Sequence, residues 1–301
     1  MDMTLTSEGD PRSFGSGSEK GLVSIIIPTY NRGYIIADAL NSVLNQSYRN
    51  IEVIVVDDAS SDGTEELVKS FGDGRISYIR HDANRGEAGA TNTGILRSRG
   101  EFITFLDSDD EIFPEKISRQ VGIMEDEPGL GACFTSVLEP GDNGVDRVWV
   151  PFNPPESFCN VSGMYRRKTF MRAWLLDEKL ELCSDVEISV RLYRECEVKT
   201  VEDVLMRRKR SPDSKSLRPG SRDAKYRSYV TIYRRHGGFL TRKFGRKFIS
   251  GEMRGWGKYL LEQGKWSEAR KCLIKAMSVC PWDLTLYGKF LFSFRFFRML
   301  R

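Results

Sequence analysis

Four short runs rich in apolar and β-branched residues divide the first hundred or so positions of the chain. The strongest of them do not alternate between apolar and polar side chains, which is typical of strands buried on both faces of a sheet. The runs cover residues 23–27, 51–56, 75–80 and 102–106. The first strand is expected to stop at Pro28, because proline cannot donate a hydrogen bond to a neighbouring strand.

Helical patterns lie between these strands. Apolar residues recur at helical spacing from about Tyr34 to Leu44, a short helix is expected from Glu65, and residues 90–97 continue the series. Gly100 is placed to close the last of these helices. Strands that alternate with helices predict an α/β fold, a doubly wound and mostly parallel sheet flanked by helices, with right-handed crossovers.

The pattern becomes less regular in the second half of the chain. Helices are predicted at residues 114–127, 167–176 and 185–195, and strands at 131–138, 198–201 and 204–206, with a hairpin arm at 145–150. Residues 139–162 are rich in Pro, Gly and Asn, and indicate either a loop beside an acceptor or a plain surface excursion. A basic loop at 207–220 is the best domain boundary.

Three parts are therefore expected in the 301 residues: a disordered leader at 1–20, an α/β domain at 21–215 and a basic α-helical region at 216–301. The leader is polar and rich in Gly and Ser, without the apolar core of a signal peptide. No apolar run approaches the length of a membrane-spanning helix. Six scattered cysteines and two histidines argue against a disulfide framework and a zinc centre, and fit a cytosolic protein.

Charge is divided unevenly along the chain. Residues 1–206 contain 21 Lys and Arg against 36 Asp and Glu, whereas residues 207–301 contain 25 against 6, which together give the net charge of +4. The basic final third indicates a polyanionic partner, such as an anionic membrane face, a lipid phosphate or nucleic acid.

An acidic cluster follows the strand at 102–106. Asp107, Asp109, Asp110 and Glu111 lie within five residues, and neighbouring carboxylates repel one another unless a cation joins them. Ligands of open α/β sheets gather beyond the carboxyl ends of the strands. The cluster is either a divalent-metal site that also holds phosphates or a solvated turn that caps the next helix. Polar residues at the ends of the first and second strands favour the metal site.

Four segments together resemble the family 2 glycosyltransferases, whose fold is called GT-A. They are the first two strands with their turns, the loop before the helix at 90–97, and the acidic cluster. Their residues are 23–32, 51–64, 84–94 and 105–111. The resemblance covers about residues 22–215. It implies an enzyme that moves a sugar from a nucleotide-sugar donor, with a UDP-sugar as the first expectation, to a hydroxyl of a glycan or lipid-linked acceptor, with inversion, in glycan, polysaccharide or glycolipid biosynthesis.

The same resemblance assigns a cofactor, Mg²⁺ or Mn²⁺, to the acidic cluster. Asp109 in the family's Asp-x-Asp motif would hold the metal, which stabilises the departing diphosphate. Asp107 would lie at the sugar–ribose side or hold the metal through water. Asp110 and Glu111 are expected to cap the next helix.

Other residues would hold the nucleotide. By the resemblance, Asp58 accepts a hydrogen bond from the uracil ring or pairs with the base, while Asp57 and Asp62 stabilise their turn. Arg85 would lie beside the diphosphate, where a guanidinium is useful, or be a surface arginine. Backbone and ring surface for the nucleotide would come from Pro28, Thr29 and Tyr30.

The catalytic base implied by the resemblance is Asp185. It lies in a segment that resembles the family's Glu-Asp pair, with Ser184 in place of the glutamate. The alternative is that Asp185 is only the N-cap of its helix. Glu187 and Arg191 have the spacing of a helical ion pair. Family members often carry Arg-x-His near residues 207–216. This chain has no histidine there, and Lys209 or Arg210 would supply the positive charge.

Two features mark the C-terminal region. Residues 259–281 resemble one tetratricopeptide-like helix pair, with Gly264 at the turn and Ala269 and Ala276 at close contacts; a single pair is expected to pack on the catalytic domain. The aromatic segment 290–301 is either an interfacial helix on an anionic membrane or a packing helix. Its arginines, at three-residue spacing, are Arg295, Arg298 and Arg301.

Two other functions remain open from the sequence. A sugar nucleotidyltransferase would also combine an α/β sheet with acidic metal ligands, but Pro28 and Thr29 stand where a Gly-rich phosphate loop would follow the first strand. A catalytically inactive GT-A scaffold is the non-enzyme alternative. We expect a cytoplasmic protein with a peripheral membrane association at the inner face, and no nucleic-acid partner.

Overall fold

The computed structural model describes residues 17–141, 144–151, 160–173, 175–209, 211 and 220–299. By its internal contacts the chain divides into two compact units, Met1–Ser221 and Arg222–Arg301. The boundary predicted at 215/216 lies outside the described residues, as do residues 1–16 of the predicted leader. The first strand already begins at Glu19, within that leader.

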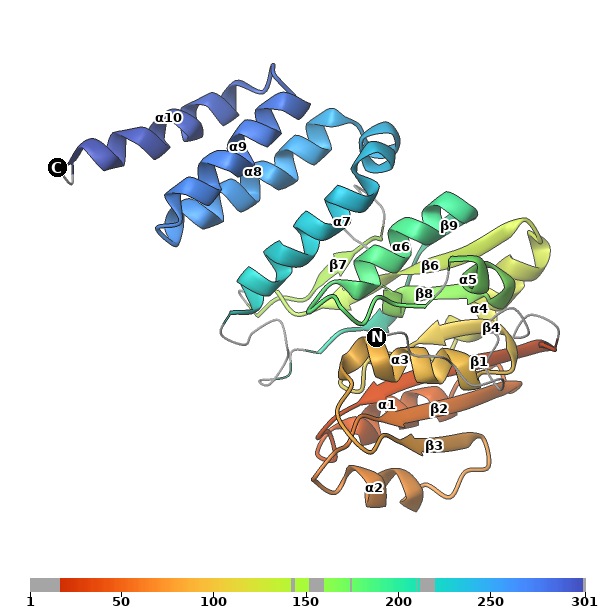
Figure 1. The fold of residues 1–301 in the computed structure, drawn as a ribbon. Coiled ribbons are helices and arrows are strands. Elements are labelled where there is room, and N and C mark those ends of the chain that lie inside the picture. Colours follow the sequence, from red (N-terminus) through yellow and green to blue (C-terminus); the bar gives the residue numbers. More distant parts are fainter. Residues whose placement is uncertain are drawn as a thin grey trace, which may run out of the picture. The chain divides into compact units, whose positions relative to one another are not determined.

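The first unit is built on one nine-stranded sheet (Figure 1). Its strands are β1 (Glu19–Thr29), β2 (Ile51–Asp57), β3 (Ile76–Arg80), β4 (Gly100–Phe105), β5 (Glu111–Ile112), β6 (Leu130–Glu139), β7 (Arg147–Trp149), β8 (Gly163–Arg166) and β9 (Glu197–Arg207). Their order is β3-β2-β1-β4-β8-β6-β9-β5, with β7 paired to β6. Strands β3, β2, β1 and β4 are parallel neighbours, as predicted, so their carboxyl ends share one edge.

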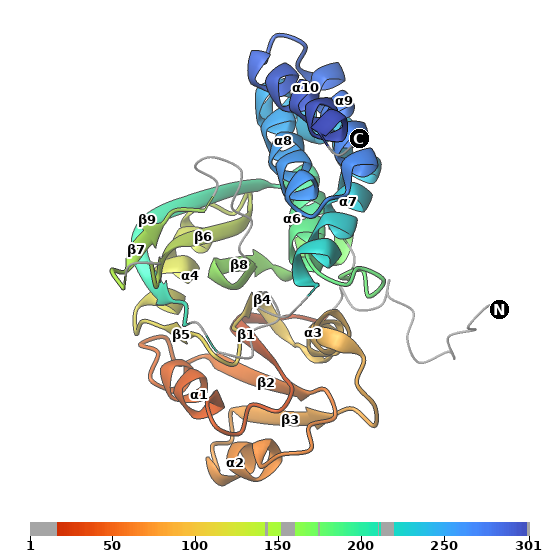
Figure 2. The same ribbon diagram turned by 90° about the vertical axis from the view of Figure 1, so that its left-hand side faces the viewer.

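Helices cover both faces of this sheet. They are α1 (Ile36–Leu44), α2 (Thr64–Ser70), α3 (Gly86–Arg97), α4 (Lys116–Asp126), α5 (Arg167–Ala173) and α6 (Ser184–Glu195). Figure 2 shows α1 and α4 on one side of the sheet and α3 and α6 on the other. The apolar faces of β1, β2, β4 and β6 are fully buried between these layers, and this double burial explains why their sequences do not alternate.

Two predictions about strand ends were wrong. Strand β1 continues through Pro28, which pairs with Val56 of β2. Its nitrogen faces the β4 side, where the ladder has ended at Ile26, so no strand hydrogen bond is lost. Gly100 does not close a helix but begins β4. A Cβ there would lie 2.6 Å from the carbonyl oxygen of Leu22, and only glycine allows this approach.

Two short strands were not predicted, and both pair in the antiparallel direction. Strand β8 lies between β4 and β6. It joins the parallel strands β3, β2, β1 and β4 to the rest of the sheet. Strand β5, inside the predicted helix-capping region, pairs with β9. The two runs predicted at 198–201 and 204–206 are one strand, β9, with a register irregularity near its middle.

The second unit consists of helices in its described part. They are α7 (Ser221–Phe244), α8 (Arg246–Glu262), α9 (Trp266–Val279) and α10 (Leu284–Met299). Helices α8 and α9 form the predicted pair: Gly264 has φ +70° at the turn, and Ala269 and Ala276 are completely buried. Its kinship with tetratricopeptide repeats and its packing on the first unit stay predictions. No helix in the described part of the chain is long and apolar enough to cross a membrane.

Candidate functional site

A cavity of about 340 Å³ opens where the carboxyl ends of β1, β2 and β4 meet. The turns after these strands and the start of α3 supply its walls. Its lining residues are Pro28, Thr29, Tyr30, Arg32, Asp58, Asn84, Gly86, Glu87, Ala90, Asp107, Ser108 and Asp109. Five residues assigned to the nucleotide sugar from the sequence, and Asp109, assigned to the metal, are therefore together in one cavity. The hydroxyl of Thr29 is buried and has no hydrogen-bond partner among the described residues.

The turns after β1 and β2 are tied to each other. Asn31, with φ +53°, donates its N–H to Ser60 Oγ at 2.8 Å and accepts from the N–H of Ser61 at 2.8 Å. Asp62 accepts the N–H groups of Gly33 and Thr64 at 3.0 and 3.1 Å. These bonds fix one wall of the cavity before any ligand enters.

Asp57 and Asp62 stabilise this turn, as predicted. The completely buried Asp57 accepts the N–H of Ser60 at 2.7 Å and the hydroxyl of Tyr78 at 2.5 Å. Burial and the bond to Asp57 raise the pKa of Tyr78.

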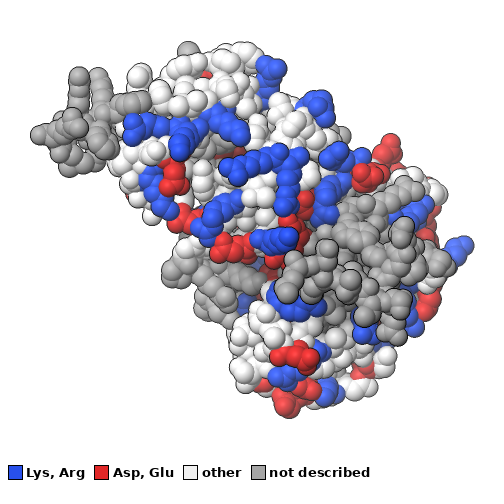
Figure 3. Space-filling view, viewed as in Figure 1, with Lys and Arg blue, Asp and Glu red and all other residues white. Residues whose placement is uncertain are grey.

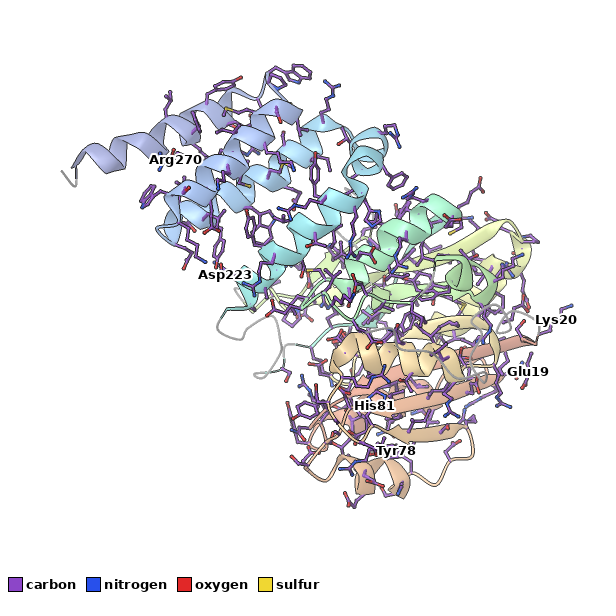
Figure 4. The ribbon with its side chains drawn as sticks, in the orientation of Figure 1. Glu19, Lys20, Tyr78, His81, Asp223 and Arg270 are labelled. Atoms are coloured by element: carbon purple, nitrogen blue, oxygen red, sulfur yellow. The ribbon has the colours of Figure 1, made fainter. Side chains whose placement is uncertain are left out.

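Asp58 organises the amino end of α3. Its carboxylate accepts the backbone N–H groups of Arg85 and Gly86, both at 2.8 Å, which are among the donors that a helix leaves unpaired. The Nδ1 atom of His81 lies 2.8 Å from the same carboxylate, and the other ring nitrogen lies 2.9 Å from Thr93 Oγ1. Figure 4 places His81 at the end of β3, beside α3. Asp58 lines the cavity, and its contact with the base stays a prediction.

Asp107 and Asp109 both line the cavity, and a positively charged arginine side chain lies beside Asp109. The guanidinium Nη1 of Arg32 lies 3.7 Å from Asp109 Oδ2. Burial raises the pKa of Asp107 well above its ordinary value, and the charges of Asp110, Glu87 and Asp109 add to this. The cavity therefore concentrates negative charge that a cation would compensate.

Asp110 and Glu111 do not cap the following helix, so that expectation was wrong. Helix α4 begins at Lys116, with Glu115 as its N-cap. Asp110 instead accepts the backbone N–H of Lys209 at 2.9 Å, and Glu111 accepts from Lys209 Nζ at 2.5 Å. These carboxylates anchor the segment that follows β9.

Lys209, one of the two residues expected to supply positive charge near the diphosphate, therefore has other carboxylate partners. Lys209 Nζ also lies 2.8 Å from Asp38, and Arg210 lies outside the described residues. Burial raises the pKa values of Asp107 and Asp185, and the charge of the neighbouring Arg208 acts against this rise.

Asp185 lies in the first turn of α6 and is not its N-cap. The N-cap is Cys183, with φ +62°. Burial raises the pKa of Asp185 to about 6, with a further contribution from the charge of Glu87. Glu87 raises the pKa of Asp107 as well, so α3, the end of β4 and the start of α6 share one electrostatic environment. The predicted ion pair of Glu187 and Arg191 is present at 2.7 Å.

Arg85 differs from the other donor-site residues. Its backbone begins α3, but its guanidinium lies 3.3 Å from Glu178 and is half exposed. It is not among the lining residues of the cavity, and its role toward the diphosphate stays a prediction. Arg32 lies in the segment 23–32 that resembles the family, but the sequence assigns it no role. Its contact with Asp109 arises only because the turns after β1 and β4 meet in space.

The residues fit a hard divalent cation. Such ions take oxygen ligands and bind through one or two carboxylates plus substrate phosphates. Asp107 and Asp109 supply carboxylates on the cavity wall, where burial, followed by the charges of neighbouring carboxylates, raises the pKa of Asp107. Among the described residues no three His, Cys, Asp or Glu side chains form a metal cluster, so phosphates would have to complete the ligand set.

Comparison with known proteins agrees with this geometry. Residues 24–173 match the family model of "Glycosyl transferase family 2". The UDP-Glc:alpha-D-GlcNAc-diphosphoundecaprenol beta-1,3-glucosyltransferases WfgD and WfaP of Escherichia coli are 45 % and 43 % identical over 103 and 148 residues. These matches cover 34 % and 47 % of this chain, and 41 % and 58 % of the two relatives.

Solved structures share the fold. S. aureus TarS 1-349, in complex with UDP-GlcNAc, has a TM-score of 0.62 at 19 % identity, covering 91 % of this chain and 89 % of that one. The mannosyltransferase PcManGT from Pyrobaculum calidifontis, in complex with GDP-Man and Mn²⁺, has a TM-score of 0.54 at 19 % identity, covering 71 % and 63 %. With its GT-A-like sheet and the match over residues 24–173, this chain belongs to the family 2 glycosyltransferases.

Proposed function

We propose that this protein transfers a sugar from a UDP-sugar to a hydroxyl group of a lipid-linked glycan, with inversion at the anomeric carbon. The observation that carries the proposal is the cavity that brings Asp58, Asp107 and Asp109 together beside the start of α3. The two glucosyltransferase relatives support the choice of a UDP-sugar and of a lipid diphosphate acceptor.

Asp185 is the proposed general base. A carboxylate with a pKa near 6 is ionised at neutral pH and is a stronger base than an ordinary aspartate. It takes the proton of the acceptor hydroxyl as the oxygen bonds to the anomeric carbon. The bond from that carbon to the diphosphate breaks at the same time, and the nucleoside diphosphate leaves with the electron pair.

The remaining residues hold the donor. Tyr30, which is 42 % exposed, offers ring surface to the base, and Asp58 accepts from it. Asp109, with Asp107, would hold Mg²⁺ or Mn²⁺, which supplies Lewis-acid stabilisation of the leaving diphosphate when bound. Arg32, which lines the cavity, and the more distant Arg85 and Arg208 supply positive charge for the diphosphate.

An anionic membrane surface is the proposed location of the acceptor. Lys and Arg are prominent on the visible face of the helices of the second unit (Figure 3). Four large apolar side chains in the described part of this unit are exposed, Ile274 by 51 %, Trp282 by 66 %, Leu291 by 63 % and Tyr287 by 40 %. The last two are four residues apart on α10 and share a face. The side chains of Arg295 and Arg298, and all of Arg301, lie outside what the structure describes.

Donor binding and turnover test the transferase proposal separately. Calorimetry with UDP-Glc, UDP-GlcNAc and GDP-Man, with Mn²⁺ or with EDTA, should show binding of a UDP-sugar that Asp109→Asn weakens. Asp185→Asn should keep donor binding and lose turnover with a GlcNAc-diphospholipid acceptor. The matched control is Asp126→Asn, an exposed aspartate at the end of α4, which should change neither. A chain that binds no nucleotide sugar under any condition is a scaffold, not a transferase.

Vesicle binding tests the membrane proposal. Trp282→Ser together with Leu291→Ser should reduce co-sedimentation with phosphatidylglycerol vesicles, while phosphatidylcholine vesicles should bind little of either protein. If wild type and the double variant sediment equally with anionic vesicles, these exposed side chains of the second unit do not bind the membrane.

A further inference from the structure

The guanidinium of Arg32 joins three segments of the donor cavity. Its Nη1 atom donates to Ser211 Oγ at 2.6 Å and to the hydroxyl of Tyr34 at 3.0 Å, and lies 3.7 Å from Asp109 Oδ2. These partners come from the turn after β1, the turn after β4 and the segment after β9. The side chain is only 12 % exposed, so its position is set by the protein and not by solvent.

The backbone of Arg32 is also fixed. Its N–H donates to Thr64 Oγ1 at 3.0 Å, and its carbonyl accepts the N–H groups of Ile35 and Ile36, both at 3.0 Å. The preceding residue, Asn31, has a positive φ and is bonded to the turn after β2. The fold therefore presents this guanidinium to the cavity with little conformational freedom left to lose on binding.

The charges of the lining residues indicate that Arg32 has a role in ligand binding. Four carboxylates line the cavity, those of Asp58, Glu87, Asp107 and Asp109, whereas Arg32 is the one Lys or Arg among the lining residues that the structure describes. A donor diphosphate adds more negative charge. A guanidinium is suited to bind phosphate oxygens in a bidentate manner, and Arg32 is the lining cation that can do so from its present place.

We propose that Arg32 is the counter-ion of Asp109 in the donor-free protein and that it exchanges this partner for the donor diphosphate when a divalent cation binds Asp109. Arg32 and the cation compete for the same carboxylate, and the diphosphate compensates the arginine that the cation displaces. Because the same Nη1 atom holds Ser211, the exchange also reaches the segment after β9. This inference rests on the proposed function, since it takes a nucleoside diphosphate as the ligand.

Binding of UDP and of Mn²⁺, measured separately by calorimetry, tests the exchange without any turnover. Arg32→Gln removes the charge and should weaken UDP binding in saturating Mn²⁺ about 10- to 100-fold, the value of one charge-assisted hydrogen bond. The same variant should bind Mn²⁺ alone about two- to fivefold more tightly, because its competitor at Asp109 is gone. Arg32→Lys keeps the charge without the planar fork and should give intermediate UDP affinity.

Arg75→Gln is the matched control. Arg75 pairs with Asp73 at 2.8 Å and is not a lining residue of the cavity, so neither affinity should change. Thermal unfolding checks that each variant folds, and Arg32→Lys decides the outcome if Arg32→Gln does not. The inference is overturned if UDP affinity stays within twofold of wild type, or if Mn²⁺ affinity falls. Wild-type protein that binds neither UDP nor a UDP-sugar refutes the proposed function as well, which separates the two failures.

Discussion

The Asp185 carboxylate is expected to lower the stability of the folded protein. Asp185→Asn should therefore yield a more stable protein that no longer catalyses sugar transfer. Burial, together with the charge of Glu87, raises the pKa of this carboxyl from 3.8 to about 6. The folded state therefore binds the proton more tightly than the unfolded state. Stability from this group falls as the pH rises through this interval and stays low above it.

The size of the effect follows from the two pKa values. One pKa unit corresponds to 1.36 kcal/mol, so the interval from 3.8 to about 6 corresponds to about 3 kcal/mol. Asparagine has nearly the shape of the protonated acid and carries no charge. The variant should gain about 3 kcal/mol at pH 7.5, or about 6–12 °C in Tm for a unit of this size, and only about 0.5 kcal/mol at pH 4, just above the unfolded pKa of 3.8.

Urea unfolding at pH 4, 5, 6 and 7.5, with donor binding by calorimetry beside it, measures this directly. Asp62→Asn is the matched control with the opposite sign. Although burial acts to raise it, the hydrogen bonds from Thr64 and Gly33 lower the pKa of Asp62. Removing that charge should therefore cost stability at pH 7.5, and the cost should shrink as the pH falls.

Two results would refute the reasoning about Asp185. A variant no more stable than wild type at pH 7.5 would mean that the carboxylate is well solvated or paired in the folded state. A gain of equal size at pH 4 and pH 7.5 would mean that shape, not charge, is responsible.

Three further predictions follow from other contacts. If Asp185 is the base, kcat/KM should fall about tenfold per pH unit below pH 6, and a profile flat to pH 4.5 would exclude it. Gly94→Ala places a Cβ 2.3 Å from Ile26 Cγ2 and should cost about 1–3 kcal/mol, whereas Gly122→Ala, where nothing lies within 4 Å, should gain about 0.4–1 kcal/mol; urea unfolding compares them, and equal effects would contradict the packing. Asp58→Ala removes the carboxylate that accepts the N–H groups of Arg85 and Gly86, and should cost about 1–3 kcal/mol in the same assay even without donor.

The half of the fold that forms the cavity, strands β1, β2 and β4 with their turns, could be predicted because its sequence patterns are local. Strands β1, β2 and β4 are buried on both faces, so their sequences are continuous apolar runs, and each turn follows its own strand directly. Parallel pairing then places the turns at one edge. The sequence therefore predicts that Asp58, Asp107 and Asp109 lie together, and all three line the cavity.

The remaining features depend on contacts between distant residues. Nothing near Asp110 in the sequence indicates that its partner is Lys209, ninety-nine residues later. Arg32 and Ser211 are separated by 179 residues. Strand β8 has four residues, too few for a periodic signal, and its pairing partners β4 and β6 decide its conformation.

The bonds of Asp58 to α3 affect how the acidic residues of such a chain can be used to judge whether it is active. Asp58 supports the fold whether or not a donor ever binds, so selection for folding alone would preserve it in a lineage that had lost catalysis. If Asp185 is the catalytic base, it has the opposite balance, because its buried charge opposes folding and its presence serves turnover. A descendant that became a scaffold should therefore keep Asp58 and replace Asp185 early, so Asp185 is the more informative sign of a working enzyme.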